Sequence, residues 1–284
     1  MKRAAISLAV VFSAACSLVN DLDDTRGPSS GGAGGSAGSA SGGTDAGDAT
    51  VDAGDGNGGT DTGGSDAGPT CDDSGAVAAD YTLHAVAEDA LAINGMCNDA
   101  VWKNAAPIAF AGTNPSDNTA VCKLLWSPAA VDVLFGCCEV QDSKLESTHT
   151  SADTNVYEDD SIEIFVKGND DRSDFGATTS KVTINIQQAV LDVDFVPDAW
   201  DVSYSASVVA AVVLNGTLNG APADTGYSIE WRMNLGFDVD PSKAGLLGFA
   251  LNDRDDGVKK TWSAFGQDVN APSDWAILGL SCAP

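Results

Sequence analysis

Histidine is scarce in this chain, and the common catalytic motifs are missing from its foldable part. Only 2 of the 284 residues are histidines, and they lie far apart. Beyond the glycine-rich segment 16–70, neither a Gly-x-Ser-x-Gly elbow nor a His-Glu-x-x-His zinc motif occurs. Carboxylates are plentiful, so a glycosidase-type acid and base pair stays open. Because a small domain rarely encloses a substrate well enough to raise a carboxyl pKa, we expect no enzyme activity.

Basic residues are also few. The chain has 14 of them against 41 acidic residues, for a formal charge of −27. Such a field repels phosphate backbones and anionic lipid surfaces, so we expect no nucleic-acid binding and no membrane contact through the protein surface itself. It favours solubility and attracts divalent cations. A solvated acidic surface on an exported protein is the simpler interpretation.

No apolar run is long enough to span a bilayer, and the N-terminal one has the form of an export signal. Lys2 and Arg3 precede an apolar stretch from Ala4 to Phe12, and Ser13-Ala14-Ala15 forms a small-residue cleavage site. Residues 1–15 are therefore predicted to be a signal peptide.

Cys16 follows the cleavage site directly, as the lipid-bearing cysteine does in a bacterial lipoprotein. Ser13 stands where the lipid-attachment motif usually has leucine, so plain secretion is the alternative. We expect an exported protein that a lipid on Cys16 anchors to the outer membrane or cell surface, with Ser17 favouring the outer membrane. The oligomeric state is left open.

Cysteine number supports this interpretation. The chain has 7 cysteines, and setting Cys16 aside leaves an even number for disulfides, with fifteen possible pairings. Cys137 and Cys138 are neighbours on an expected strand, so their side chains point to opposite faces and need different partners. Cys122 is a candidate partner for one of them across a hairpin. The remaining candidates are Cys97, Cys71 and Cys282, of which the last two would join the ends of the domain. A metal site is less favoured, since no C-x-x-C pair occurs.

Residues 16–70 are expected to form a disordered tether. From about residue 26 they are almost entirely Gly, Ser, Ala, Thr and Asp, and Val51 is the one large apolar residue. Such a segment cannot bury enough surface to offset its ordering entropy. A Gly/Ser linker of ~45 residues has a root-mean-square reach of roughly 35–40 Å, which suits a spacer.

Residues 71–284 carry frequent strand signals and little helical periodicity. The patterns predict an all-β fold, a β-sandwich of the immunoglobulin-like or jelly-roll type. A hairpin is expected from 121–126 to 131–140, a central strand at 208–214, and one helical turn at 98–104 with Asn98 as its cap. The other expected strands are 161–166, 181–187, 227–233, 246–251 and 275–280.

An acidic run leads directly into a strand pattern at Tyr157-Glu158-Asp159-Asp160-Ser161-Ile162-Glu163-Ile164-Phe165. Asp and Glu are poor strand formers, so such a cluster usually has a local role, in hydrogen bonding, cation binding or a binding face. Other short pieces surround it in a characteristic order. They are Ile93-Asn94-Gly95, Asn98 to Lys103, Val121 to Trp126, Val131 to Asp142, Tyr227 to Trp231, Gly248 to Asp253, Thr261-Trp262 and Trp275 to Leu280.

In that order the pieces resemble the carbohydrate-binding modules of family nine, from about Ala87 to Leu280. The resemblance implies a β-sandwich that binds a glycan or polysaccharide without catalysis. In that family two tryptophans hold the end sugar of a chain. The resemblance places Tyr157 at the first of them and makes Glu163 and Asn185 hydrogen-bond partners of the sugar.

The sequence also departs from the family pattern. The loop that carries the second tryptophan corresponds to Ser263–Asp274, which contains none, and Thr183 and Ala250 stand in place of an arginine and a glutamine. Trp200 lies in a polar stretch, and is either an exposed stacking residue or part of the packing at the core or sandwich edge.

Two acidic groups offer the oxygen ligands that calcium prefers. Asp253 and Asp255 lie on a turn that ends in glycine, and Asp159 and Asp160 form the second group. Neither group matches an EF-hand loop. The alternative to a calcium site is that these carboxylates accept hydrogen bonds from the backbone of their own turns. The sequence as a whole predicts a tethered module that binds carbohydrate at the cell surface. A structural or adhesive lipoprotein with protein partners and a degenerate sugar site is the other hypothesis.

Overall fold

The computed structural model describes residues 77–111, 118–128, 133–196, 199–220, 224–235, 237 and 240–283. The predicted signal peptide, Cys16, the tether 16–70 and Cys71 lie outside these residues. Within them the helical segments are 3-10 turns of three to five residues, and no helix is long and apolar enough to cross a bilayer.

The described residues form one continuous sheet of 13 strands. The strands are β1 (Tyr81–Ala85), β2 (Ile108–Ala111), β3 (Thr119–Ser127), β4 (Val133–Gln141), β5 (Ser161–Lys167), β6 (Thr179–Asn185), β7 (Val190–Val196), β8 (Ala199–Asp201), β9 (Val209–Leu214), β10 (Tyr227–Asn234), β11 (Gly245–Asp255), β12 (Val258–Ser263) and β13 (Ala276–Ser281). The 3-10 turns are η1 (Glu88–Ala90), η2 (Ala100–Asn104), η3 (Val156–Glu158), η4 (Ala264–Gly266) and η5 (Pro272–Asp274).

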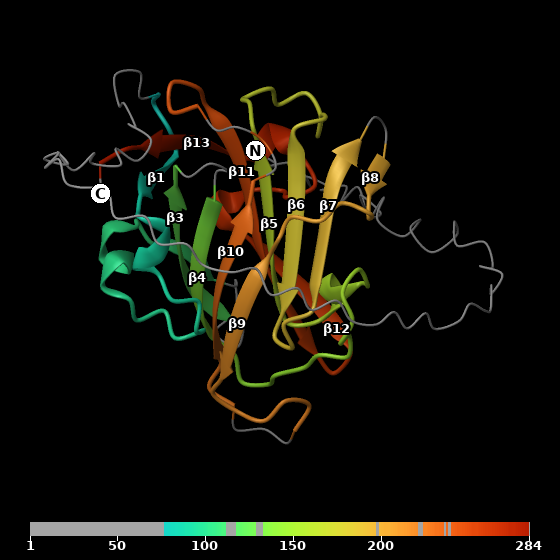
Figure 1. The fold of residues 1–284 in the computed structure, drawn as a ribbon. Helices are drawn as coiled ribbons and strands as arrows, with labels where there is room; N and C mark the ends of the chain where they lie inside the picture. The colour runs from blue at the N-terminus through green and yellow to red at the C-terminus, as the bar shows by residue number, and fades with distance from the viewer. Residues whose placement is uncertain are drawn as a thin grey trace, which may run out of the picture. The chain divides into compact units, whose positions relative to one another are not determined.

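The sheet curls so that its two halves face each other across a shared core (Figure 1). The hydrogen-bonded order is β8-β7-β6-β5-β11-β13-β1-β3-β4-β10-β9, with β2 added to β3 and β12 added to β11. Alternating residues of both halves meet inside, where the rings of Trp231 on β10 and Phe249 on β11 lie 6.1 Å apart. This arrangement confirms the predicted all-β sandwich.

The expected hairpin and the separate partners of the paired cysteines are also confirmed. Strands β3 and β4 pair antiparallel with Cys122 opposite Cys138, and these two cysteines form one disulfide. Cys137 points to the other face of β4 and bonds to Cys97. Cys282 is disulfide-bonded as well, and its predicted pairing with Cys71 lies outside the described residues.

Two local predictions were wrong. The apolar run 208–214 forms β9, an edge strand and not a central one, and its Val209 is 51% exposed. One face of β9 packs on the core through Val212. The loop at Gly95 lies against the backbone of β9 at Ala211 and Val212 and covers part of it. Asn98 does not cap η2, because the chain enters that turn through Asp99, which makes no side-chain cap bond.

The half formed by β7, β6, β5 and β11 has two different faces. Ile162 and Ile164 on β5 are buried in the shared core, as is Val182 on β6. The alternate positions of these strands, which include Glu163 and Lys181, point to the outer face. The residues predicted to bind sugar lie on or beside this solvent-facing side of β7, β6, β5 and β11, which is called the outer face from here on.

Candidate functional site

The middle of the outer face is a row of in-register residues. Glu163 on β5 lies opposite Thr183 on β6 and opposite Ala250 on β11. Residues directly opposite each other in antiparallel strands point to the same face, so these three side chains are neighbours. Glu163 is only 5% exposed, and Thr183 and Ala250 are fully covered. The row is therefore the floor of the site.

Glu163 is held by three side chains. Its Oε1 accepts a 2.7 Å hydrogen bond from Asn252 Nδ2, and its Oε2 lies 2.9 Å from Lys181 Nζ. Lys259 Nζ lies 3.8 Å from Oε1. Burial opposes ionisation of the carboxyl, but the two ammonium groups and the hydrogen bonds from Lys181 and Asn252 outweigh it, so the pKa of Glu163 lies below its ordinary value.

Tyr157, on η3, is half-buried and lies close to the two lysines that pair with this carboxylate. Lys181 Nζ lies 5.2 Å from the centroid of the ring and Lys259 Nζ lies 4.9 Å from it. Both distances fall within the range of cation–π attraction. The ring, two ammonium groups and one carboxylate thus form a single cluster on the outer face.

Trp200, on the edge strand β8, belongs to a neighbouring aromatic group. Its ring contacts those of Phe165, Phe175 and Phe195 at centroid distances of 6.3, 5.0 and 5.2 Å. It also packs, with Tyr157, against the small apolar cluster of Val156, Ala189, Leu191 and Val193. Trp200 is half-buried, so the structure places it at the sandwich edge, where it shares this apolar cluster with Tyr157.

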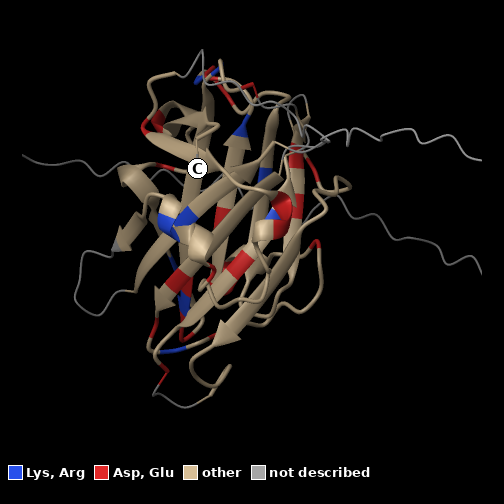
Figure 2. Ribbon diagram, turned by 60° about the vertical axis from the view of Figure 1, so that its left-hand side comes forward, with Lys and Arg blue, Asp and Glu red and all other residues tan. Residues whose placement is uncertain are grey.

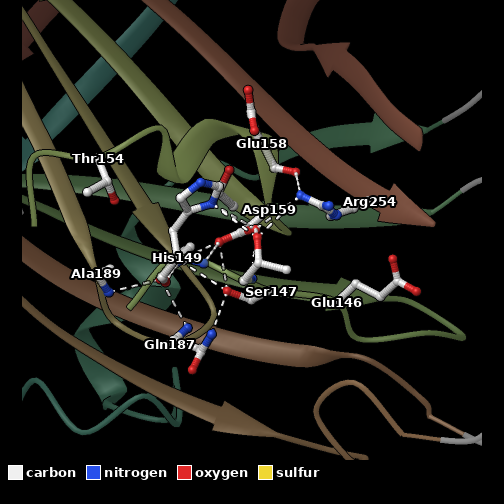
Figure 3. Close-up of polar contacts among 12 residues, drawn as sticks. Glu146, Ser147, His149, Thr154, Glu158, Asp159, Gln187, Ala189 and Arg254 are labelled. Atoms are coloured by element: carbon white, nitrogen blue, oxygen red, sulfur yellow. Dashed lines mark hydrogen bonds and ion pairs between the residues drawn. The ribbon is translucent and has the colours of Figure 1, made fainter. Parts of the chain in front are cut away.

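Asn185 and Asp159 organise the loop beside the outer face, and Figure 3 shows Asp159 among Ser147, His149 and Arg254. Asn185 Nδ2 donates to Ser147 Oγ, the His149 carbonyl and Asp159 Oδ2, and its Oδ1 accepts from the Gln187 and Ala189 amides. Its side-chain amide is fully engaged and completely buried. A sugar hydroxyl would have to displace a protein partner to bond with it.

The Asp159 carboxylate is equally engaged. It accepts hydrogen bonds from the Thr148 and His149 amides at 2.9 Å each and from Ser147 Oγ at 2.8 Å. Burial opposes its ionisation, but these donors and Asn185 outweigh it and hold the pKa of Asp159 below its ordinary value. Its role is to fix the loop that carries Ser147 and His149.

A second acidic group lies at the same end of the sandwich. Asp142, Asp160 and Asp253 are buried, and one carboxylate oxygen of each lies within 4.8 Å of the others. Both oxygens of Asp253 and Oδ2 of Asp142 lack a hydrogen-bond partner among the described residues, as does the buried hydroxyl of Tyr227. Asp255 adds a further unpartnered oxygen beside Asp253. Sequence analysis had paired Asp160 with Asp159 and had missed Asp142 and Tyr227.

The geometry makes these carboxyls hard to ionise together. Burial, followed by the charge of Asp142, raises the pKa of Asp160 to about 9. Burial and the charges of Asp142 and Asp255 raise the pKa of Asp253 to about 7. Calcium binds oxygens at 2.3–2.6 Å, so ligand oxygens up to roughly 5 Å apart can share one ion. The spacing of the three carboxyls suits a divalent cation, and Asp142 and Asp253 offer unpartnered oxygens, whereas both oxygens of Asp160 accept backbone amides.

Sequence reasoning missed the two lysines of the outer face. Lys181 alternates with Thr183 and Asn185 on β6, and that spacing was a usable signal that it shares their face. Lys259 reaches the site only because β12 folds back on β11, where it pairs in register with Arg254. Nothing local in the sequence shows this.

Comparison with known proteins supports the fold. The family described as carbohydrate family 9 binding domain-like matches residues 93–276. A family 9 carbohydrate-binding module from Caldicellulosiruptor kristjanssonii, solved with cellotriose, is 20% identical, with a TM-score of 0.53 over 72% of this chain and 94% of that one. The same kind of module solved with glucose gives 20% identity and a TM-score of 0.52, over 72% and 97% of the two chains.

Because the sequence identity is only 20%, these solved structures show a similarity of fold alone. No functionally curated protein matches the chain in sequence. The family match covers most of the chain and nearly all of the sandwich, from the loop before η2 to the start of β13. The chain therefore belongs to the carbohydrate family 9 binding domain-like family.

Proposed function

We propose that this protein binds carbohydrate, without catalysis, on the outer face at Tyr157. The observation that carries the proposal is the cluster of an aromatic ring, two ammonium groups and a buried carboxylate on one sheet face. Aromatic rings stack on pyranose rings, and ammonium groups donate to hydroxyls. Family membership supports the proposal, as do the neighbours of the same fold that were solved with cellotriose and glucose.

The proposal gives each residue a role. Tyr157 stacks on the sugar, with Trp200 extending the aromatic surface toward the sheet edge. Lys181 and Lys259 donate to sugar oxygens, and Glu163 beneath them holds both in place. Asn185 and Asp159 act indirectly, because they fix the loop and η3 from which Tyr157 projects.

Calorimetric titration of the intact exported chain with cellotriose tests the proposal. Binding should be measurable for the wild type and should fall about tenfold for Tyr157→Ala, which corresponds to a loss of about 1.4 kcal/mol of binding free energy. Val121→Ala is the control, because Val121 is an exposed apolar residue on β3, in the other half of the sandwich. A folded wild type that binds no sugar across a broad glycan panel would overturn the proposal and favour a structural or adhesive role with protein partners.

We also propose that the cluster of Asp142, Asp160 and Asp253 holds a structural calcium ion, with Asp255 beside it. The support is the close spacing of the three buried carboxyls and the oxygens of Asp142 and Asp253 that lack hydrogen-bond partners in the described part of the chain. Asp160 contributes through its position, since its two oxygens also accept hydrogen bonds from the Glu146 and Arg254 amides. An ion there would neutralise charges that otherwise repel one another in the interior. Asp159 is not included, because its carboxylate is already saturated with donors.

For the whole protein we propose export and anchoring through a lipid on Cys16, with residues 16–70 as the tether. The support is the order of charged, apolar and small residues before Cys16. Metabolic labelling with a fatty-acid analogue checks this proposal. Label on the wild type and none on Cys16→Ser is the expected result, and an unlabelled wild type found in the medium would point to secretion.

A further inference from the structure

Two cations converge on one ring in a protein that has few cations. Over the described ribbon, acidic positions outnumber basic ones (Figure 2). Lys181 and Lys259 nevertheless both lie close to the Tyr157 ring, at 5.2 and 4.9 Å from its centroid. Their side chains are only 13% and 33% exposed. This is a built arrangement at the candidate site, unlike the scattered lysines of a solvated surface.

The local charges do not balance. Glu163 pairs closely with Lys181, at 2.9 Å, and its other oxygen lies 3.8 Å from Lys259. One carboxylate therefore faces two ammonium groups. Glu158 also attracts Lys259, but it is exposed at the rim, where water screens its charge. Arg254, on the same face, does not add to this surplus, because its guanidinium lies 3.6 Å from Asp159 Oδ1 and also donates to Thr148 Oγ1 and the Glu158 carbonyl.

The floor beneath these charges contains an unsatisfied polar group. Thr183 is fully buried, and its hydroxyl lacks a hydrogen-bond partner among the described residues. It lies directly opposite Glu163 in register, so it points to the same outer face. A buried hydroxyl without a partner costs free energy that a polar ligand or a bound water can recover.

We propose that the outer face recognises a sugar that carries a carboxylate, a uronic acid residue. The sugar carboxylate pairs with Lys259, whose charge Glu163 does not neutralise, while the sugar ring stacks on Tyr157. A carboxylate on the ligand suits these lysines, since the protein's own carboxylate, Glu163, already pairs with them. This inference rests on the proposed carbohydrate function and names the class of sugar.

Paired ligands that differ only in charge test this inference. The intact exported chain is titrated with trisaccharides of galacturonate and of glucuronate, and with the same trisaccharides as methyl esters. Cellotriose and a sulfated trisaccharide complete the set. The free acid of at least one uronate should bind about tenfold or more tightly than its ester. That preference should shrink as salt is raised, because screening weakens charge pairing between exposed groups.

Variants locate the effect. Lys259→Met keeps the apolar stem and should reduce the preference for acid over ester to near unity, because binding of the acid loses a charge pair whereas binding of the ester loses only a neutral hydrogen bond. Lys123→Met, on β3 in the other half of the sandwich, should leave the preference unchanged. A purely structural role for Lys259 would not alter the ratio of acid to ester binding.

The possible failures are distinguishable. Binding of cellotriose and of the esters with no preference for either acid would overturn the acidic-sugar inference and leave the carbohydrate function standing. A preference for the sulfated sugar alone would also overturn it. Absence of binding to every sugar would overturn the proposed function together with this inference.

Discussion

Lys181 on β6 is in register with Phe165 on β5, yet its ammonium group reaches diagonally to Glu163, at 2.9 Å. The pair is almost completely shielded from water, with side-chain exposures of 13% and 7%. Breaking a buried pair by removing one partner leaves an uncompensated charge, which costs far more than the pair contributes. The ion pair therefore links the stability of this sheet to the chemistry of the candidate site.

Lys181→Met should lower the free energy of unfolding by about 3 kcal/mol, because Glu163 is left buried with only the more distant Lys259. The double variant Lys181→Met/Glu163→Gln should recover much of the loss, since the buried charge is gone. Urea denaturation measures both. Lys123→Met is the control and should stay within about 0.5 kcal/mol of the wild type. Equal losses for single and double variants would contradict the account of this pair.

Glu163 should also shape the acid sensitivity of the fold. Its folded-state pKa is lowered, since the charges of Lys181 and Lys259 outweigh burial. Below the ordinary glutamate pKa the unfolded chain therefore binds more protons than the folded chain. The stability that the ionised Glu163 contributes is complete above about pH 4.3 and is lost as the pH falls through the pKa of Glu163 in the folded protein. From about pH 6 to about pH 3 the stability of Glu163→Gln should fall less steeply than that of the wild type.

The control for that series is Glu139→Gln, at an exposed position on β4. It should follow the wild-type curve. A Glu163→Gln curve parallel to the wild type would show that the carboxylate is not stabilised by the lysines.

Asp159→Asn should loosen the loop beside Tyr157 without unfolding the sandwich. The amides of Thr148 and His149 donate to this carboxylate at 2.9 Å, and hydrogen bonds to a charged group contribute about 1.5–3 kcal/mol each. Hydrogen exchange at these amides should speed up at least about tenfold. Asp171→Asn is the control, since Asp171 caps only the Ser173 amide in an exposed turn. Unchanged exchange at Thr148 and His149 would contradict the assigned role.

Calcium should raise the free energy of unfolding of the wild type and should make Asp253→Asn less stable than the wild type. Without calcium, Asp253→Asn should be as stable as the wild type or more stable, because it removes a buried carboxylate whose charge is opposed by burial and by Asp142 and Asp255. With calcium at about a hundred times its dissociation constant, the wild type should gain about 2.7 kcal/mol and the variant much less. Asp170→Asn, at an exposed position, should respond as the wild type does. No calcium response in the wild type would rule out the site.

Much of the fold was predictable because each strand carries its own alternation. Tyr227, Ile229, Trp231 and Met233 alternate in the sequence and share the buried face of β10. The position of β9 was not predictable, because an apolar run looks the same in the middle of a sheet and at an edge that a neighbouring loop partly covers.

The candidate site was only partly predictable, because its parts come together through topology. Asp142, Asp160 and Asp253 belong to three segments whose ends meet only in the folded chain. The family resemblance makes Asn185 a ligand for sugar, but its side-chain amide is occupied by a loop that lies more than thirty residues away in the sequence. Lys259 looks like an ordinary hairpin lysine until β12 folds back on β11.

Backbone amide NMR shift mapping during a sugar titration tests the central claim most directly. Cellotriose and the uronate trisaccharides are added to the intact chain, and the perturbed amides are placed on the fold. The account predicts shifts clustered at Tyr157, Glu163, Lys181 and Lys259, with β9 and the outer side of β4 unaffected. Saturable shifts centred elsewhere, or none with any sugar, would contradict the assignment of the outer face as a carbohydrate site.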